Sequence, residues 1–297
     1  MLTIEPGKIS TGLLHSHLLG AVAPRPIAFA STMDKHGRPN LSPFSFFNVF
    51  GVNPPLAIFS PARRVKDNTI KHTLENVMET GEVVINIVNY AMVRQASLAS
   101  TEYAKGINEF EKSGFTAIPS EKVKPFRVKE SPVQLECKVN EIIHTGYEGG
   151  AGNLVICEIV LIHISEDVLD DKGKIDQHKI DVVGRLGGDW YVRANGNALF
   201  EVEKPLTTMG IGVDQLPESI RLSNVLTGNN LGQLGNVEQV PSGEESKTFI
   251  QSADWRALVD KYELNKLMEQ PHEVAKKLLE MGRVKEAWHW LISTDQE

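Results

Sequence analysis

The feature that most constrains this chain is a series of short apolar runs, separated by turn residues, between residues 24 and 193. β-Branched and aromatic residues fill the runs, while glycine, proline, asparagine and aspartate separate them, a pattern typical of β-strands. Few helical patterns lie between the runs, so crossover helices cannot join most of the strands. This favours a closed antiparallel barrel over a parallel sheet. The predicted strands are residues 25–32, 40–50, 55–60, 83–89, 133–144, 154–165 and 190–192.

Three helices are predicted among these strands. In residues 67–79 apolar side chains recur at helical spacing, with Asp67 as the N-cap and Gly81 as the stop. Two shorter helices are expected in residues 91–100 and 108–112.

The character of the chain changes near residue 198, where the strand-like alternation stops. Three helices are predicted in residues 254–269, 271–281 and 283–293, whereas residues 206–246 indicate an ordered loop with short helical turns. An apolar stripe on the last two helices must pack on a partner, either the barrel or a second subunit. The stripe consists of Val274, Leu278, Ala287, Trp288 and Leu291. We therefore expect two domains, a barrel in residues 1–200 and an extension in residues 201–297. The fold class is mainly β with added helices.

Composition excludes several classes of protein. A net charge of -7 argues against a surface that neutralises a nucleic-acid backbone. No run approaches the roughly 18 apolar residues of a membrane span. His15 and His17 interrupt the apolar segment near the N-terminus, so we expect no signal peptide and a cytoplasmic location. Cys137 and Cys157 lie in strand-like runs without metal-ligand spacing, which predicts two buried thiols.

The hairpin in residues 25–50 is dense in small hydroxyls and amides interleaved with phenylalanines. A planar ligand with a polar edge needs this mixture of aromatic surface and hydrogen-bonding groups. A plain hydrophobic core and a solvated strand face are the alternatives. The polar residues are Ser31, Thr32, Asn40, Ser42, Ser45 and Asn48, and the phenylalanines are Phe44, Phe46, Phe47 and Phe50.

A basic run follows directly, in which Arg63, Arg64 and Lys66 lead into the predicted helix at residue 67. The unpaired amides and positive pole of a helix start attract phosphate, and Arg and Lys supply charge-assisted donors. Surface charges are the alternative for these three residues. A site for a flat ring beside a site for a phosphate indicates a mononucleotide.

The order of these segments resembles the flavin reductase-like family with the FMN-binding split barrel, which includes the flavoredoxins. The resemblance covers residues 4–193. It is carried by RPIAFAST, GRPNLSPFSFFNVFGVNPPLAIFSP, KDNTIKHTLENVMETGEVVINIVN, INEFEKSGFT, SPVQLECK, GNLVICEIV and GRLGGDWYVR.

The resemblance implies an antiparallel split β-barrel and a homodimer with FMN near the subunit interface. By position, the residues on the ring and ribityl side of FMN would be Asn40, Ser42, Ser45, Phe46 and Asn48, with Ser31 and Thr32 at the strand end facing it. The phosphate would be held by Ser60, Arg63, Lys66, Asn68 and Thr69, and Lys105 would reach the cofactor from a loop.

The implied function is an oxidoreductase that passes reducing equivalents from NAD(P)H through FMN to a flavin or another small acceptor. Hydride transfer needs no general acid or base, so we assign no catalytic residue. Arg25 and Lys105 are the candidate cations for stabilising reduced flavin. The alternatives are an electron-transfer flavoprotein reduced by a protein partner, and a non-catalytic flavin-binding protein. The histidines show no metal-ligand spacing, so no metal is expected, and the extension would cover the flavin and restrict what enters.

Overall fold

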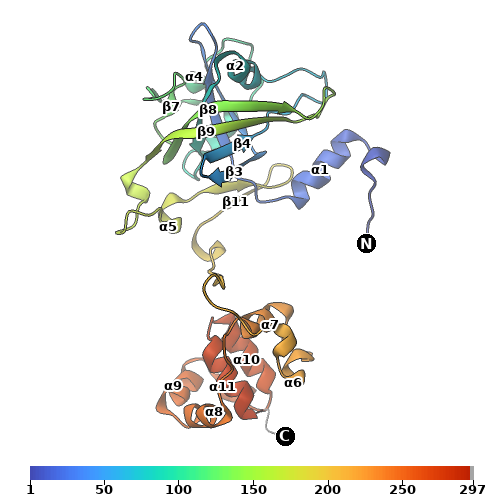
Figure 1. Ribbon diagram of the computed structural model, residues 1–297, viewed down its shortest axis with the longest axis vertical. Coiled ribbons are helices and arrows are strands. Elements are labelled where there is room, and N and C mark those ends of the chain that lie inside the picture. The colour runs from blue at the N-terminus through green and yellow to red at the C-terminus, as the bar shows by residue number, and fades with distance from the viewer. Residues whose placement is uncertain (295–297) are drawn as a thin grey trace. The chain divides into compact units, whose positions relative to one another are not determined.

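The computed structural model describes residues 1–294. The chain divides into two compact units, Met1–Phe200 and Glu201–Glu297, and each is described by itself. The first unit is built around a β-sheet and the second consists of helices (Figure 1).

The first unit contains a seven-stranded sheet in the order β2-β1-β5-β8-β9-β4-β3. Every neighbouring pair in it is antiparallel. The strands are β1 (Ala28–Met33), β2 (Pro39–Phe44), β3 (Phe47–Val52), β4 (Pro55–Phe59), β5 (Glu82–Ile87), β8 (Val133–His144) and β9 (Asn153–Ile164). Two small ribbons accompany the sheet, β6 (Ala117–Ile118) with β7 (Arg127–Val128), and β10 (Val183–Arg185) with β11 (Tyr191–Arg193).

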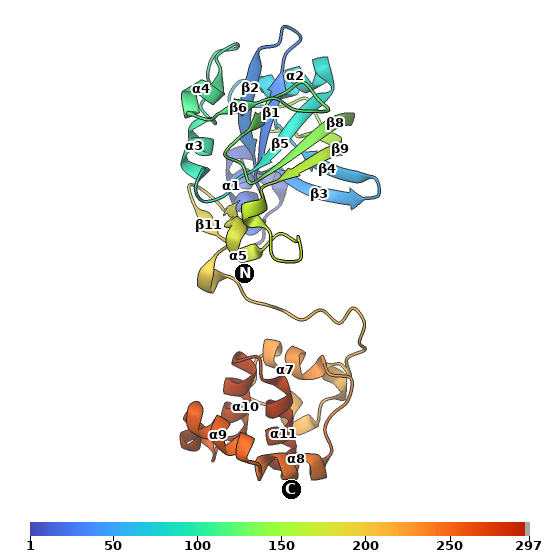
Figure 2. The same cartoon turned by 90° about the vertical axis from the view of Figure 1, so that its left-hand side faces the viewer.

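The connection between β2 and β3 shows why this sheet curls into a barrel. The two strands are at opposite edges of the sheet, yet only Ser45 and Phe46 separate them in the chain. Three Cα–Cα steps of about 3.8 Å keep the two edges within roughly 11 Å of each other. The sheet must therefore curve round on itself (Figure 2). The predicted single strand in residues 40–50 is wrong, because the chain changes edge in the middle of it. The predicted antiparallel barrel with added helices is confirmed.

Hydrophobic residues fill both faces of the sheet. On β1, Ala28 and Ala30 belong to the core inside the barrel, while Phe29 between them points to a second cluster on the other face. This alternation follows from the two-residue period of a strand. Cys137 and Cys157 lie in the inner core as free, buried thiols, as predicted, and burial raises the pKa of Cys157 to about 12.

The helices of the first unit are α1 (Thr11–Ala21), α2 (His72–Thr80), α3 (Val93–Leu98), α4 (Glu109–Ser113) and α5 (Gln177–Ile180). Helix α2 packs against β1 and β2, and α3 and α4 contact β2 (Figure 2). The predicted N-cap of α2 is wrong by about a turn. Asp67 accepts hydrogen bonds from Thr69, and Asn68 has a φ of 58°, a left-handed conformation that a helix does not allow. The predicted stop is confirmed, with Gly81 at a φ of 68°.

In its described residues, 201–294, the second unit packs six α-helices around one core. They are α6 (Glu218–Arg221), α7 (Gly228–Gly235), α8 (Gly243–Ile250), α9 (Ala253–Lys261), α10 (Pro271–Glu280) and α11 (Val284–Thr294). The apolar stripe of α10 and α11 packs within this unit, on neighbours such as Leu234 and Trp255. The predicted loop in residues 206–246 contains α6, α7 and the start of α8. The predicted helix 254–269 ends early, because Glu263 adopts a left-handed φ of 51°. Within residues 1–294, each helix is too short or too polar to cross a lipid bilayer.

Candidate functional site

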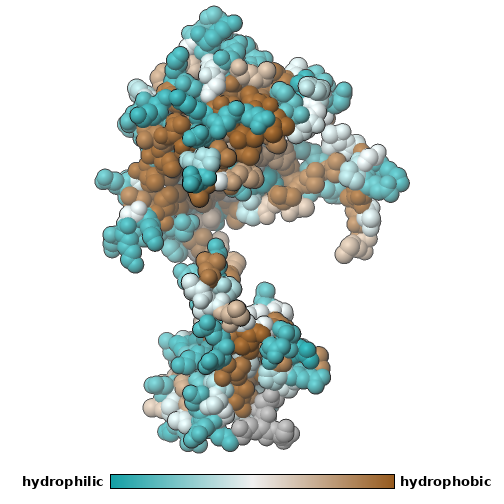
Figure 3. All heavy atoms as spheres, in the orientation of Figure 1, coloured by the Kyte–Doolittle hydropathy of each residue, from teal (hydrophilic) through white to brown (hydrophobic). Residues whose placement is uncertain are grey.

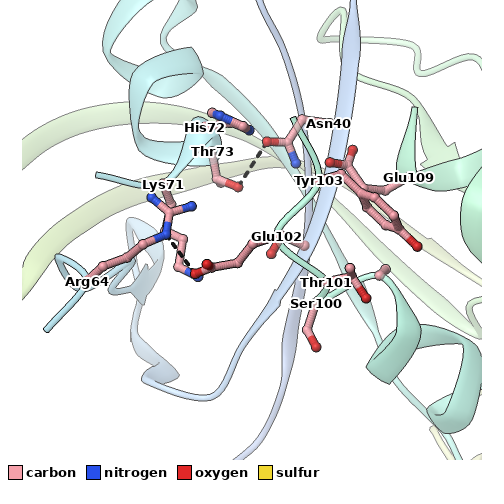
Figure 4. Close-up of a pocket in the computed structure, with 12 residues that line it drawn as sticks. Asn40, Arg64, Lys71, His72, Thr73, Ser100, Thr101, Glu102, Tyr103 and Glu109 are labelled. Carbon is pink, nitrogen blue, oxygen red and sulfur yellow. Dashed lines mark hydrogen bonds and ion pairs between the residues drawn. The ribbon is translucent and has the colours of Figure 1, made fainter. Parts of the chain in front are cut away.

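A polar pocket lies where β2, the start of α2 and the loop after α3 meet (Figure 4). β2 contributes Asn40 and Ser42, which alternate with Leu41 and so share one face of the strand, while Leu41 joins Phe29 in the cluster on the other face. Its other lining residues are Arg64, Lys71, His72, Thr73, Ala99, Ser100, Thr101, Glu102, Tyr103 and Glu109.

The start of α2 gives this pocket a positive pole. Lys71 is the N-cap residue, and its side chain makes no capping hydrogen bond. Among the hydrogen bonds of residues 1–294, none is donated by the backbone amides of His72 and Thr73. Two amides at the end of a nine-residue helix are therefore available to an anion.

Three cations converge on one carboxylate at the mouth of the pocket. Arg64 Nε lies 2.7 Å from Glu102 Oε1, Lys66 Nζ lies 2.6 Å from Oε2, and Lys71 Nζ lies 3.6 Å from Oε1. Hydrogen bonds from Lys66 and Arg64 hold the pKa of Glu102 at about 2, so it is ionised at neutral pH. The cations thus form an anion subsite that a carboxylate of the same chain occupies.

The guanidinium of Arg64 is held in place by its own loop. Its Nη1 donates to Thr69 Oγ1 at 2.9 Å and to the carbonyl of Ile70 at 2.6 Å. The side chain is only 16% exposed, so a contact made by this cation is partly protected from solvent. Fixed donors of this kind bind phosphate oxygens better than mobile surface cations do, because less side-chain entropy is lost on binding.

The pocket also has polar lining residues away from the three cations. Thr73 Oγ1 donates to Asn40 Oδ1 at 3.5 Å, and burial lowers the pKa of His72. Glu109 is buried and accepts a hydrogen bond from the amide of Leu41 at 3.1 Å, and its burial raises its pKa. A pocket with a cationic mouth and a polar interior suits a ligand with an anionic end.

The residues predicted for the ring side of the cofactor separate into two groups. Asn40 and Ser42 line the pocket. Ser45 accepts a hydrogen bond from Arg25 at 3.3 Å, while Phe46 and Asn48 are exposed on or beside β3. The assignment of the second group to FMN stays a prediction.

The predicted residues on β1 are fully buried. The amide of Asn76 donates to Thr32 Oγ1 at 3.0 Å, whereas Ser31 Oγ has no hydrogen-bond partner among the described residues. Neither residue lines the pocket.

The residues predicted for the phosphate mainly shape the loop before α2. Arg63 donates to the side chain and to the carbonyl of Asn68, at 2.6 and 2.7 Å. Ser60 Oγ accepts a hydrogen bond from the amide of Asn153 at 3.1 Å. Thr69 supports Arg64, and Lys66 belongs to the cation cluster. Whether Ser60, Arg63 and Asn68 contact a phosphate stays a prediction.

The two cations nominated for reduced flavin are engaged elsewhere. The guanidinium of Arg25 donates to the carbonyls of Leu19, Val22 and Leu186, and so joins the end of α1 to the loop after β10. Lys105 pairs with Glu75 at 2.5 Å.

Sequence reasoning did not assign Arg64, Lys71, Glu102 or Glu109 to the site. Arg64 stood in the basic run, but only the folded loop shows which of the two neighbouring arginines faces the pocket. Glu102 and Glu109 come from a segment more than 30 residues farther along the chain, and no local pattern marks them.

The pocket gathers several groups that can bind an anion. It offers one group of cations, two backbone amides and the hydroxyl and amide groups of β2. Glu102 lies on the same cations that a phosphate would contact, as Figure 4 shows for Arg64. A phosphate that binds Arg64 Nε would have to compete with Glu102 for this donor.

Comparisons with known proteins found similar sequences and structures. The chain is 38% identical over 189 residues to an uncharacterized protein from Aquifex aeolicus, an alignment covering 64% of this chain and 94% of that protein. The structure of nitrilotriacetate monooxygenase component B from Bacillus cereus is similar, with a TM-score of 0.63 and 30% identity, over 68% of this chain and 98% of that chain.

A flavin reductase-type protein with a split barrel domain from Shewanella frigidimarina NCIMB 400 has a TM-score of 0.56 and 29% identity, over 67% of this chain and 95% of that one. Residues 20–178, more than half of the chain, match the family model of the flavin reductase like domain. The chain therefore belongs to the flavin reductase-like family, whose members share a split-barrel fold and a flavin-dependent redox function.

Proposed function

We propose that this chain binds FMN in the pocket at the start of α2 and uses it to pass reducing equivalents from NAD(P)H to a flavin or another small acceptor. The observation that carries the proposal is the group of Arg64, Lys66 and Lys71 beside the free amides of α2. In a flavin reductase-like fold, such a subsite next to the polar face of β2 has the layout that a flavin with one phosphate needs.

The single anion subsite favours FMN over FAD. The three cations converge on one carboxylate, and a dinucleotide would require donors for a second phosphate. The sequence also lacks the GxGxxG turn with which Rossmann domains hold a pyrophosphate. One phosphate and one group of cations match in number.

Six residues of the pocket have a defined task under this proposal. Arg64, Lys71 and the amides of His72 and Thr73 hold the phosphate, and Asn40 and Ser42 offer hydrogen bonds to the polar part of the ligand. Bound FMN would supply the redox chemistry, taking hydride from a reduced nicotinamide and giving electrons to the acceptor. The protein contributes position and charge.

We further propose that the first unit forms a homodimer, as its family resemblance implies. The edge strand β3 exposes Val49, Phe50 and Val52 at 49%, 63% and 88%. Ile143, Ile162 and others extend this apolar surface across β8 and β9, where Figure 3 shows hydrophobic residues gathered. Exposed patches and open strand edges of this kind mark protein interfaces. Sedimentation of the purified protein as a monomer at micromolar concentration would contradict this part of the proposal.

An anaerobic spectroscopic titration tests the proposed function. FMN is added to the purified protein until the flavin spectrum shows saturation, and NADH or NADPH is then added. We expect a tight yellow complex whose flavin absorbance bleaches with one equivalent of nicotinamide and returns when free flavin or oxygen is admitted. A colourless protein with FMN present would refute the proposal. A yellow protein that neither nicotinamide bleaches would support an electron-transfer flavoprotein reduced by a partner protein, or a flavin-binding protein without activity.

A further inference from the structure

Glu102 occupies the place where the proposed function requires a phosphate. One carboxylate oxygen lies 2.7 Å from Arg64 Nε, and the other lies 2.6 Å from Lys66 Nζ. Lys71 Nζ lies 3.6 Å from the first of these oxygens. Figure 4 shows this side chain pointing from the loop after α3 toward Arg64 and Lys71. The inference below rests on the proposed function, because it concerns the same subsite.

The loop that carries Glu102 is fastened at two points. Glu102 holds it to the cations, and Lys105 holds it to Glu75 of α2 at 2.5 Å. Gly106 follows with a φ of 91°, a left-handed conformation that other residues rarely adopt. Residues 101–106 form no helix or strand, and segments of this kind open at a lower free-energy cost than packed elements do.

A phosphate and the Glu102 carboxylate compete for the same donors. The Nε of Arg64 can donate to only one oxygen at full strength, and two anions within contact distance repel each other. A ligand phosphate must therefore replace Glu102 on the cations.

We infer that Glu102 is a specificity-determining residue, a carboxylate of the chain itself that a phosphate group, but not a weaker anion, is charged enough to displace. Inorganic phosphate and FMN, each close to a dianion at neutral pH, exchange with it. A flavin without a phosphate leaves it on the cations. Glu102 thereby lowers the affinity for FMN while keeping the subsite closed to weaker anions.

The competition persists over the whole neutral range. Because the pKa of Glu102 is held at about 2, the side chain does not lose its charge between pH 5 and 9. The side chain of Glu102 is 42% exposed, so salt screens its ion pairs and moderates the competition. Each such pair shifts an equilibrium by up to about fivefold, which places the combined effect near tenfold.

The test compares Glu102→Gln with Glu75→Gln, a matched control. The control removes one charge from the same loop attachment but leaves Glu102 on the cations. Dissociation constants for FMN and riboflavin are measured by quenching of flavin fluorescence, at low and high salt. We expect Glu102→Gln to bind FMN about tenfold more tightly than the wild type and riboflavin with unchanged affinity. Glu75→Gln should differ from the wild type by less than about twofold in both.

Equal or weaker FMN binding by Glu102→Gln would overturn the inference, since Glu102 would then position the cations rather than compete for them. Glu102→Asp, which keeps the charge on a shorter side chain, should lie between the wild type and Glu102→Gln, and it serves if the amide variant does not fold. If the wild-type protein failed to bind FMN, the proposed function would be refuted while the inference about Glu102 would remain open to test. Titration with inorganic phosphate would still decide the inference, because Glu102→Gln must bind phosphate more tightly than the wild type.

Discussion

Replacing Arg64 with methionine should remove most of the phosphate's contribution to FMN binding. Arg64 is the least exposed of the cations on Glu102, at 16%, and its guanidinium is fixed by Thr69 and Ile70. Methionine keeps much of the side-chain length but donates no hydrogen bond. Arg63→Met is the matched control, because the side chain of Arg63 donates its hydrogen bonds to Asn68.

The size of the effect follows from the kind of bond that is lost. A hydrogen bond to a charged group contributes about 1.5–3 kcal/mol, which corresponds to roughly a 10- to 100-fold change in affinity. We expect the lower half of that range. Arg64→Met also removes the 2.7 Å contact between Arg64 and Glu102, so Glu102 is held less tightly and competes less strongly with the phosphate. We therefore predict a rise in the FMN dissociation constant of about 10- to 30-fold.

The assay measures FMN and riboflavin binding to both variants at one ionic strength. Arg64→Met should lose affinity for FMN and keep its affinity for riboflavin, which has no phosphate. Arg63→Met should keep its FMN affinity and show only a lower melting temperature, since it loosens the loop before α2. The reverse pattern, with Arg63→Met losing FMN and Arg64→Met unaffected, would refute the placement of the phosphate.

Three further predictions concern the second unit. A chain ending at Phe200 should still bind FMN with wild-type affinity, because the cores of the two units share no residues; loss of binding by a folded truncated protein would contradict this. Burial lowers the pKa of His289, so its contribution to stability is complete above about pH 6.5 and is lost as the pH falls below that value. Thermal melting of the second unit between pH 7.5 and 5.5 should show this decline, and it should be smaller in His289→Gln. Trp288→Phe removes the 3.1 Å hydrogen bond that the buried indole donates to the carbonyl of Leu234. The loss should lower the free energy of unfolding by about 2 kcal/mol and the melting temperature by roughly 10 °C. An unchanged melting temperature would show that the carbonyl finds another donor.

Alternation of apolar residues predicted the strands well, because the inner face of a small barrel must be hydrophobic along its whole length. The long strands β8 and β9 lie within one residue of their predicted bounds. The pattern could not show that residues 40–50 change from one edge of the sheet to the other. That break depends on closure of the barrel, which is a property of the whole sheet.

Local signals predicted part of the site for a similar reason. The polar run on β2 gave Asn40 and Ser42, and the basic run gave the position of the cation cluster. The left-handed turn at Asn68 decides that Arg64 rather than Arg63 faces the pocket, and periodicity does not predict such a turn. Glu102 is brought to the cluster by the tertiary fold alone, so no motif near the basic run could indicate it.

The most direct test of the account is a crystal structure of the protein grown with FMN. We predict that the phosphate lies within hydrogen-bond distance of Arg64 and of the backbone amides of His72 and Thr73, and that Glu102 has left the cations. A phosphate bound elsewhere, with Glu102 still paired to Arg64, would contradict it.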